Sequence, residues 1–131
     1  MKTLIVEDDF VSRKILLRQL SKLGECDLAV NGTEAIEAFM QASKESEPYD
    51  LICLDIMLPG MDGIAVLKKI RVLEGQEGLN TPKRVKILMT TSLSDKEIVI
   101  KAIQAQCDGY LVKPVAQQKL EDKLKELKLL A

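Results

Sequence analysis

Histidine is absent from the 131-residue chain, and cysteine occurs only three times. Without histidine the chain lacks the commonest general base and the usual transition-metal ligand of proteins. Cys26, Cys53 and Cys107 form an odd set without Cys-x-x-Cys spacing, which favours reduced structural thiols over disulfides or zinc ligands. We therefore expect neither imidazole-based catalysis nor a disulfide or zinc framework.

The chain also lacks a long hydrophobic run and a clear excess of either charge. The apolar run Leu4–Val6 is cut short by Glu7, Asp8 and Asp9, so it is no signal peptide, and no stretch approaches the length of a membrane span. Nineteen basic and twenty acidic residues give a net charge of -1, which provides no broad positive field for nucleic acid or anionic lipid. We expect a cytoplasmic protein that neither binds nucleic acid nor inserts into membranes.

The remaining composition is typical of one soluble domain. A hydrophobic content of 47% with 30% charged residues suits a single domain over residues 1–131, and no repeat, low-complexity tract or linker is visible. Short apolar segments alternate with amphipathic ones, which predicts successive βα units around a parallel sheet. The predicted strands are Thr3–Val6, Cys26–Val30, Asp50–Leu54, Val85–Thr90 and Gly109–Val112.

Apolar residues three and four positions apart predict helices between these strands. Three such sets are Leu16, Leu20 and Leu23; Ile98, Ala102 and Ala105; and Leu120, Leu124 and Leu127. Asp62-Gly63 is expected to begin the third helix, and Ser94–Glu97 has the form of a capping box. Glu74–Lys83, with two glycines and a proline, is predicted to be a mobile loop without chemistry of its own.

Polar residues follow four of the predicted strands, at the edge where the carboxyl ends of parallel strands meet. They are Glu7, Asp8 and Asp9 after the first strand, Asp55 at the third, Thr91 and Ser92 after the fourth, and Lys113 and Pro114 after the fifth. Taken singly, the acidic run could be a helix cap, Thr91 a strand end and Lys113 a surface charge. Because one sheet edge collects them all, together they indicate a built site.

The charges of this set predict a bound cation. Two carboxylates about 4 Å apart repel by roughly 4 kcal/mol at an effective dielectric constant of about 20. Lys113 alone would leave Glu7, Asp8 and Asp55 net negative, whereas a divalent ion that prefers oxygen ligands, Mg²⁺ above all, would complete the cluster. Mg²⁺, a lysine, a hydroxyl and a free carboxylate suit phosphoryl transfer, in which a carboxylate can itself be the acceptor.

Four ordered motifs carry a resemblance to a known family: Val6–Asp9, Leu54–Gly63, Met89–Ser92 and Gly109–Pro114. Over essentially the whole chain they resemble the response regulator receiver domain of two-component signal transduction, in its chemotaxis-type single-domain form. The resemblance implies a flavodoxin-like, doubly wound α/β fold. Its five parallel strands would lie in the order 2-1-3-4-5, with helices on both faces.

The resemblance also implies roles for the carboxylates. Asp55 would accept the phosphoryl group, and Asp8, Asp55 and the carbonyl of Met57 would bind Mg²⁺, with Glu7 reaching the ion mostly through water. Met57 and Leu93 are bulkier and more apolar than the polar residues commoner two positions after the acceptor and two after Thr91. We expect them to limit the access of water and so to prolong the life of the aspartyl-phosphate.

By the same resemblance, Lys113 would pair with one phosphoryl oxygen and Thr91 would donate a hydrogen bond to another. Tyr110 would change rotamer as Thr91 moves, which couples the site to the face formed by the fourth helix, fifth strand and fifth helix. The peptide bond between Lys113 and Pro114 would be cis.

The predicted function is a phosphorylation-activated signalling switch that catalyses only its own phosphorylation and dephosphorylation. Because the chain has no histidine, the phosphohistidine donor must be another protein, either a sensor histidine kinase or a histidine phosphotransfer protein. A downstream effector protein would read the switched surface, since no output domain follows the fifth helix, and the switch would be a monomer or a weak phosphorylation-dependent dimer.

The sequence leaves three alternatives. The chain could be a receiver module from a hybrid kinase or multidomain regulator, although Met1 directly before the first strand favours a stand-alone protein. It could be a Mg²⁺-dependent phosphohydrolase of the haloacid dehalogenase kind, but the expected general acid is replaced by Met57. A pseudo-receiver without phosphorylation is disfavoured because every residue of the acceptor site is present.

Overall fold

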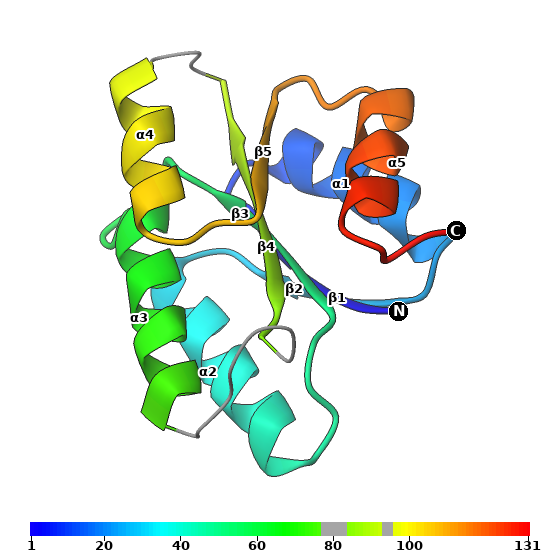
Figure 1. The fold of residues 1–131 in the computed structure, drawn as a ribbon. Helices are drawn as coiled ribbons and strands as arrows, with labels where there is room; N and C mark the ends of the chain where they lie inside the picture. Colours follow the sequence, from blue (N-terminus) through cyan, green and yellow to red (C-terminus); the bar gives the residue numbers. More distant parts are fainter. Residues whose placement is uncertain (77–83, 93–95) are drawn as a thin grey trace.

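A parallel sheet of five strands lies between two layers of helices (Figure 1). The computed structural model describes residues 1–76, 84–92 and 96–131. The strands are β1 (Lys2–Val6), β2 (Glu25–Ala29), β3 (Leu51–Asp55), β4 (Lys86–Thr91) and β5 (Gly109–Val112). The helices are α1 (Phe10–Ser21), α2 (Gly32–Lys44), α3 (Gly63–Gln76), α4 (Lys96–Gln104) and α5 (Gln117–Glu126).

The strand order β2-β1-β3-β4-β5, with parallel pairing throughout, confirms the predicted topology. Four of the five strands differ from their predicted bounds by one residue at an end or at both. The shift has one consequence for the site, because Asp55 is the last residue of β3 and pairs with Thr90 of β4. Its carboxylate is therefore held by the ladder itself and not by a loop after it.

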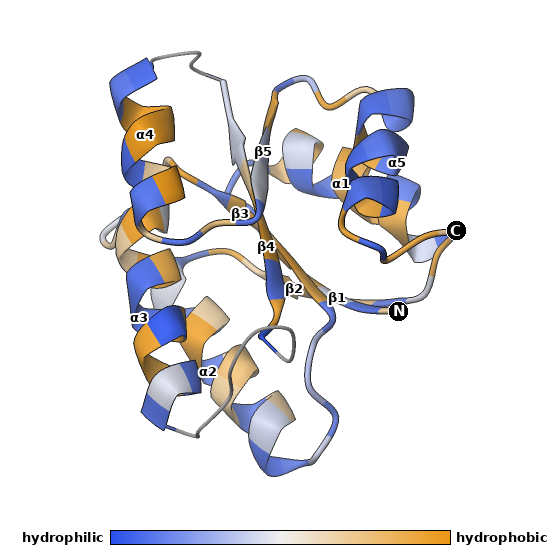
Figure 2. Ribbon diagram, viewed as in Figure 1, coloured by the Kyte–Doolittle hydropathy of each residue, from blue (hydrophilic) through white to orange (hydrophobic). Residues whose placement is uncertain are grey.

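Each face of the sheet has its own hydrophobic core. Helices α2, α3 and α4 cover one face and α1 and α5 the other, with their apolar sides turned toward the strands (Figures 1 and 2). Of the predicted apolar positions within the helices, Leu16, Leu20, Ala102, Leu120 and Leu124 are buried, whereas Ile98 is partly buried. The last member of each set, Leu23, Ala105 or Leu127, lies beyond the end of its helix and is only partly buried.

Polar side chains begin the first three helices. Asp9 accepts a hydrogen bond from the amide of Ser12 at α1, and Asn31 accepts one from Glu34 at α2. Asp62 accepts one from the amide of Ala65 at 2.9 Å, so α3 begins at the predicted place. In the predicted capping box at Ser94–Glu97, Ser94 and Asp95 lie outside the described residues.

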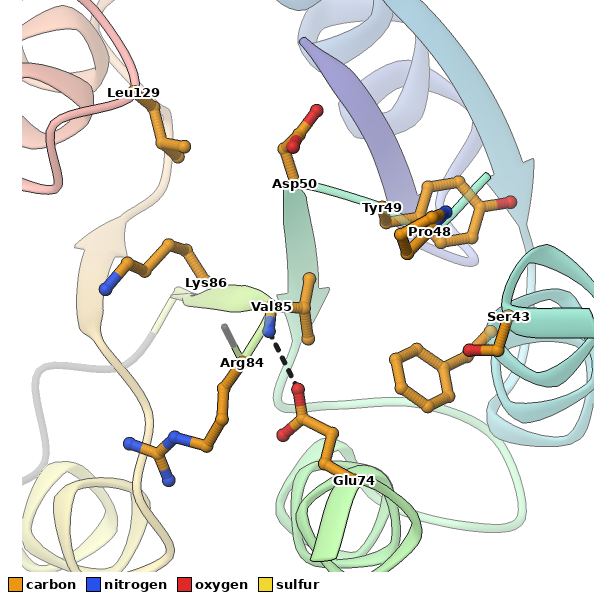
Figure 3. A pocket seen from close by; sticks show the side chains of 10 residues that line it. Ser43, Pro48, Tyr49, Asp50, Glu74, Arg84, Val85, Lys86 and Leu129 are labelled. Atoms are coloured by element: carbon orange, nitrogen blue, oxygen red, sulfur yellow. Dashed lines mark hydrogen bonds between the residues drawn. The ribbon is translucent and has the colours of Figure 1, made fainter. Parts of the chain in front are cut away.

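The predicted loop Glu74–Lys83 is wrong at its start, because α3 continues to Gln76. Glu74 is only 1% exposed, and its carboxylate accepts hydrogen bonds from Arg71 and from the amide of Val85, both at 2.7 Å. Figure 3 shows the bond from Val85. Arg71 also donates to Asp108 at 2.8 Å. This buried charge network joins α3 to the start of β4 and extends the helix past the point where the glycines suggest a break. Residues 77–83 of the predicted loop lie outside the described residues.

Two predictions from absence can be compared with the structure. Cys26, Cys53 and Cys107 are all free thiols, and burial raises the pKa of Cys53 to about 12, so this thiol stays protonated. Among the helices of the described ranges, none combines the length and the apolar character that a bilayer crossing would need.

Candidate functional site

Three carboxylates meet at the carboxyl ends of the two central strands. Glu7 and Asp8 follow β1 and Asp55 ends β3, and one oxygen of each lies within 4.8 Å of the others. Glu7 is 0% exposed and Asp55 is 4% exposed, whereas Asp8 is open to solvent. The cluster thus consists of two buried carboxylates and one that is exposed to solvent.

Lys113 lies between the two buried carboxylates. Its Nζ donates to both oxygens of Glu7, at 2.8 and 2.9 Å, and to Oδ2 of Asp55 at 2.8 Å. The backbone amide of Lys113 donates to the carbonyl of Thr91, so the residue following β5 is fixed to the end of β4. The peptide bond to Pro114 is cis, as predicted.

One ammonium therefore pairs with two buried carboxylates, and the pKa values show that it does not fully compensate their charge. Burial, reinforced by the neighbouring Asp55 carboxylate, raises the pKa of Glu7 from 4.5 to about 7, although Lys113 acts in the opposite direction. Burial lowers the pKa of Lys113, but its hydrogen bonds and charge interactions with Asp55 and Glu7 outweigh this, so its pKa is raised. The lysine therefore stays charged. Of the two buried carboxylates, Glu7 is the one whose ionised form is destabilised.

The backbone around Asp55 leaves little room for change. The amide of Met57 donates to Oδ1 of Asp55 at 3.0 Å, and the amide of Gly63 donates to the carbonyl of Ile56 at 2.8 Å. A Cβ atom at Gly63 would lie 2.1 Å from the carbonyl oxygen of Asp55, so only glycine fits this close approach. Met57 itself is 58% exposed beside the site. Its carbonyl as a metal ligand stays a prediction.

The predicted switch residues lie on the neighbouring strands. Thr91 is the buried last residue of β4 and pairs with Val112 of β5. Tyr110, on the same β5, is 38% exposed, so its ring has access to the surface. The structure thus brings Thr91 next to the strand that carries Lys113, while the roles of Thr91 and Tyr110 remain predictions. Leu93, expected to limit water access, lies outside the described residues.

Arg13 is a residue of the site that the sequence did not single out. Its guanidinium Nη1 donates to the backbone carbonyls of Glu7 and Asp8, at 3.0 and 3.2 Å. An arginine in the first turn of a helix that follows an acidic loop could have suggested this contact. However, bonds to backbone oxygens leave no pattern of complementary side chains in a sequence.

The donor set fits a magnesium ion. Glu7, Asp8 and Asp55 with Lys113 carry a formal charge of -2, and the possible ligand atoms are carboxylate oxygens, which hard divalent cations prefer. With few carboxylates and an accessible side at Asp8, there is space for the waters that Mg²⁺ usually retains. The described residues contain no histidine or cysteine in this cluster, so softer metals have no preferred ligand.

Comparisons with known proteins agree with this geometry. The family model for the response regulator receiver domain matches residues 3–125. Hybrid signal transduction histidine kinase L of Dictyostelium discoideum is 35% identical over 126 residues, which is 95% of this chain but 7% of that protein. The chain spans between 3% and 16% of the length of the first curated relatives it matches.

Two solved structures are close in shape. The receiver domain of the Arabidopsis thaliana histidine kinase CKI1, in complex with Mg²⁺ and BeF3⁻, has a TM-score of 0.83 and 27% identity, covering 98% of this chain and 90% of that one. The receiver domain of Saccharomyces cerevisiae Ssk1, in complex with the histidine phosphotransfer protein Ypd1, has a TM-score of 0.83 and 32% identity, covering 97% and 88%. The chain described here belongs to the response regulator receiver domain family.

Proposed function

We propose that this chain is a phosphorylation-activated switch in which Asp55 accepts a phosphoryl group from a phosphohistidine of another protein, in a Mg²⁺-dependent reaction. The observation that carries the proposal is the contact of Lys113 with both Asp55 and Glu7 at 2.8 Å, inside a cluster of three carboxylates. One reactive carboxylate with a fixed ammonium beside a cation site is the arrangement that phosphoryl transfer requires.

Asp55 is the nucleophile in this proposal. One of its carboxylate oxygens forms the bond to phosphorus while the bond from phosphorus to the donor's imidazole nitrogen breaks, and the electron pair stays on that nitrogen. The amide of Met57 and the ammonium of Lys113 each hold one oxygen of Asp55, so the carboxylate is oriented before the donor arrives. The reaction removes the negative charge of the Asp55 carboxylate, with which Lys113 pairs. The phosphoryl oxygens would then replace that carboxylate as the partner of Lys113.

Glu7, Asp8 and Asp55, with the carbonyl of Met57, would hold Mg²⁺. When bound, the ion neutralises negative charge on the phosphoryl oxygens. Glu7, whose pKa is about 7 in the metal-free protein, would be held in its ionised form by the added positive charge. The neighbour with Mg²⁺ and BeF3⁻ bound supports this choice of metal.

The donor is proposed to be a histidine phosphotransfer protein or a sensor histidine kinase. The chain contains no histidine, so phosphohistidine must come from elsewhere, and the Ssk1 receiver is known in complex with the phosphotransfer protein Ypd1. The proposal applies equally to a chain that acts alone and to a module of a longer protein. The phosphohydrolase alternative is not favoured, because Met57 offers no proton to a leaving group.

The signal is proposed to leave through the surface of α4, β5 and α5. Phosphorylation replaces one negative charge with roughly two and adds acceptor oxygens. Thr91 would meet them by moving toward Asp55, and Lys113, already in contact with Asp55, would transfer its hydrogen bond to them. Because the amide of Lys113 is bonded to the carbonyl of Thr91, both strand ends would move together. Tyr110 on β5 would transmit the change to an effector protein that binds this face.

The experiment is incubation of the metal-free protein with acetyl phosphate, with and without Mg²⁺, followed by intact mass measurement. The wild type is expected to gain the mass of one phosphoryl group only with Mg²⁺, and Asp55→Ala none. Asp122→Ala, which removes an exposed carboxylate of α5, is the matched control and should behave as wild type. Phosphorylation of Asp55→Ala to the same extent, or none in the wild type, would refute the proposal.

A further inference from the structure

The loop between β1 and α1 carries three consecutive acidic residues, and each is fixed differently. Glu7 is held by its amide, which donates to the carbonyl of Ala29 at 3.0 Å, and by Lys113 at its carboxylate. Asp9 is held as the cap of α1 by the amide of Ser12 at 2.8 Å. Asp8 and Asp9 are both exposed, but the carboxylate of Asp9 caps α1, so Asp8 is the exposed residue whose carboxylate can bind a cation.

Arg13 holds the backbone of Asp8 directly. Over the ranges that the structure describes, Asp8 makes no hydrogen bond except the one that its carbonyl accepts from Arg13 at 3.2 Å. The same Nη1 binds the carbonyl of Glu7 at 3.0 Å, so one guanidinium spans the two residues that contribute carboxylates after β1. The side chain of Arg13 also lies over the ring of Phe10, at 5.7 Å from its centroid, which limits the conformations the arginine can adopt.

Two opposing effects on a bound cation follow from this position. The positive charge of Arg13 repels a divalent ion, which would weaken binding. In contrast, the two hydrogen bonds order the backbone of Asp8 before the ion arrives, so that less conformational entropy is lost on binding. The charge effect is screened at the solvent-exposed end of the cluster, whereas the ordering effect acts on the ligand itself.

We propose that Arg13 is a positioning residue that sets the affinity of the site for Mg²⁺ by fixing Asp8, and that this ordering outweighs the repulsion of its charge. The inference rests on the metal site of the proposed function. It assigns to Arg13 no contact with the metal or with the phosphoryl group, only hydrogen bonds to the backbone that carries the ligands. Partners of this kind commonly change metal affinity by 10-fold or more when they are removed.

The test is titration of MgCl₂ into the metal-free protein by calorimetry, with three variants. Arg13→Gln is expected to bind Mg²⁺ about 10-fold more weakly than wild type. Arg13→Lys keeps the charge and a donor for one carbonyl, and it should recover part of the loss. Lys14→Gln removes a neighbouring charge that makes no hydrogen bond in the described part of the chain, and its Mg²⁺ affinity should equal or slightly exceed that of wild type.

Equal or tighter Mg²⁺ binding by Arg13→Gln would overturn the inference, as would Arg13→Lys binding no more tightly than Arg13→Gln. Phosphorylation by acetyl phosphate gives a second readout: the Mg²⁺ concentration for half-maximal rate should rise by the factor seen in calorimetry, with the rate at saturating Mg²⁺ retained. A fall in the saturated rate alone would also contradict it. Failure of the proposed function would instead appear in the wild type, as Mg²⁺ binding without phosphorylation.

Discussion

Glu7→Gln should remove most of the pH dependence of stability between pH 5 and 8 in the metal-free protein. In the wild type, Glu7 and Asp55 share the single ammonium of Lys113, and burial raises the pKa of Glu7 to about 7. The native state therefore takes up a proton on Glu7 at a pH where the unfolded chain has already released it. The contribution of Glu7 to the free energy of unfolding is fully present below pH 4.5, and it is lost as the pH rises through about 7.

The size of the effect follows from the two pKa values. A rise from 4.5 to about 7, at about 1.4 kcal/mol per pH unit, makes the native protein about 3 kcal/mol less stable at pH 8 than at pH 4.5. Gln has no charge to bury, and its carbonyl can still accept a hydrogen bond from Lys113. The variant should therefore be flat within about 1 kcal/mol over this range and more stable than wild type at pH 8.

Urea unfolding in the presence of EDTA at pH 5, 6, 7 and 8 measures both curves. Because the chain has no histidine, no imidazole titration contributes to the pH dependence of stability in this range. Saturating Mg²⁺ should abolish or reverse the decrease of stability with pH in the wild type, since the ion stabilises ionised Glu7. The pH dependence of the variant should change little. Parallel slopes for wild type and Glu7→Gln in EDTA would show that another group titrates and that Glu7 is not the strained carboxylate.

Two further predictions concern the lifetime of the switch and the rigidity of its frame. Met57→Asn should accelerate loss of the phosphoryl group, because a smaller polar side chain admits water beside Asp55. Intact mass followed over time measures the decay, with Met61→Asn as the control. Unchanged or slower decay in Met57→Asn would contradict this prediction. Glu74→Gln should lower the free energy of unfolding by about 2–4 kcal/mol, because the buried Arg71 loses one of its two charged partners. Glu126→Gln removes an exposed ion pair with Lys123 and should cost less than about 0.5 kcal/mol. Equal losses in urea unfolding would refute the role of burial.

The alternation of strand and helix was predictable because it leaves a regular pattern of apolar residues. Strand ends shifted by one residue because the pattern marks apolar residues, whereas pairing in β3 and β4 extends to Asp55 and Thr91, which are polar but buried. The position of Asp55 at a strand end and that of Lys113 after β5 could likewise be predicted, since parallel strands deliver their carboxyl ends to one edge.

The contacts that could not be predicted are made by long side chains. Arg13 reaches back to backbone carbonyls, and Arg71 joins Glu74 to Asp108, a residue distant in the chain. Neither has a periodicity, and a buried Glu74 beside a glycine looks the same in a sequence as a solvated one. The exact sharing of Lys113 between Glu7 and Asp55 depends on side-chain geometry that only the folded sheet defines.

The bond from Lys113 to Glu7 joins residues that are 106 positions apart. A chain still being made on the ribosome cannot close this contact until β5 has been synthesised and added to the sheet beside β4. Unfinished copies thus carry Asp55 without its ammonium partner. The arrangement that the proposed function requires therefore forms only after residue 113 has been added to the chain.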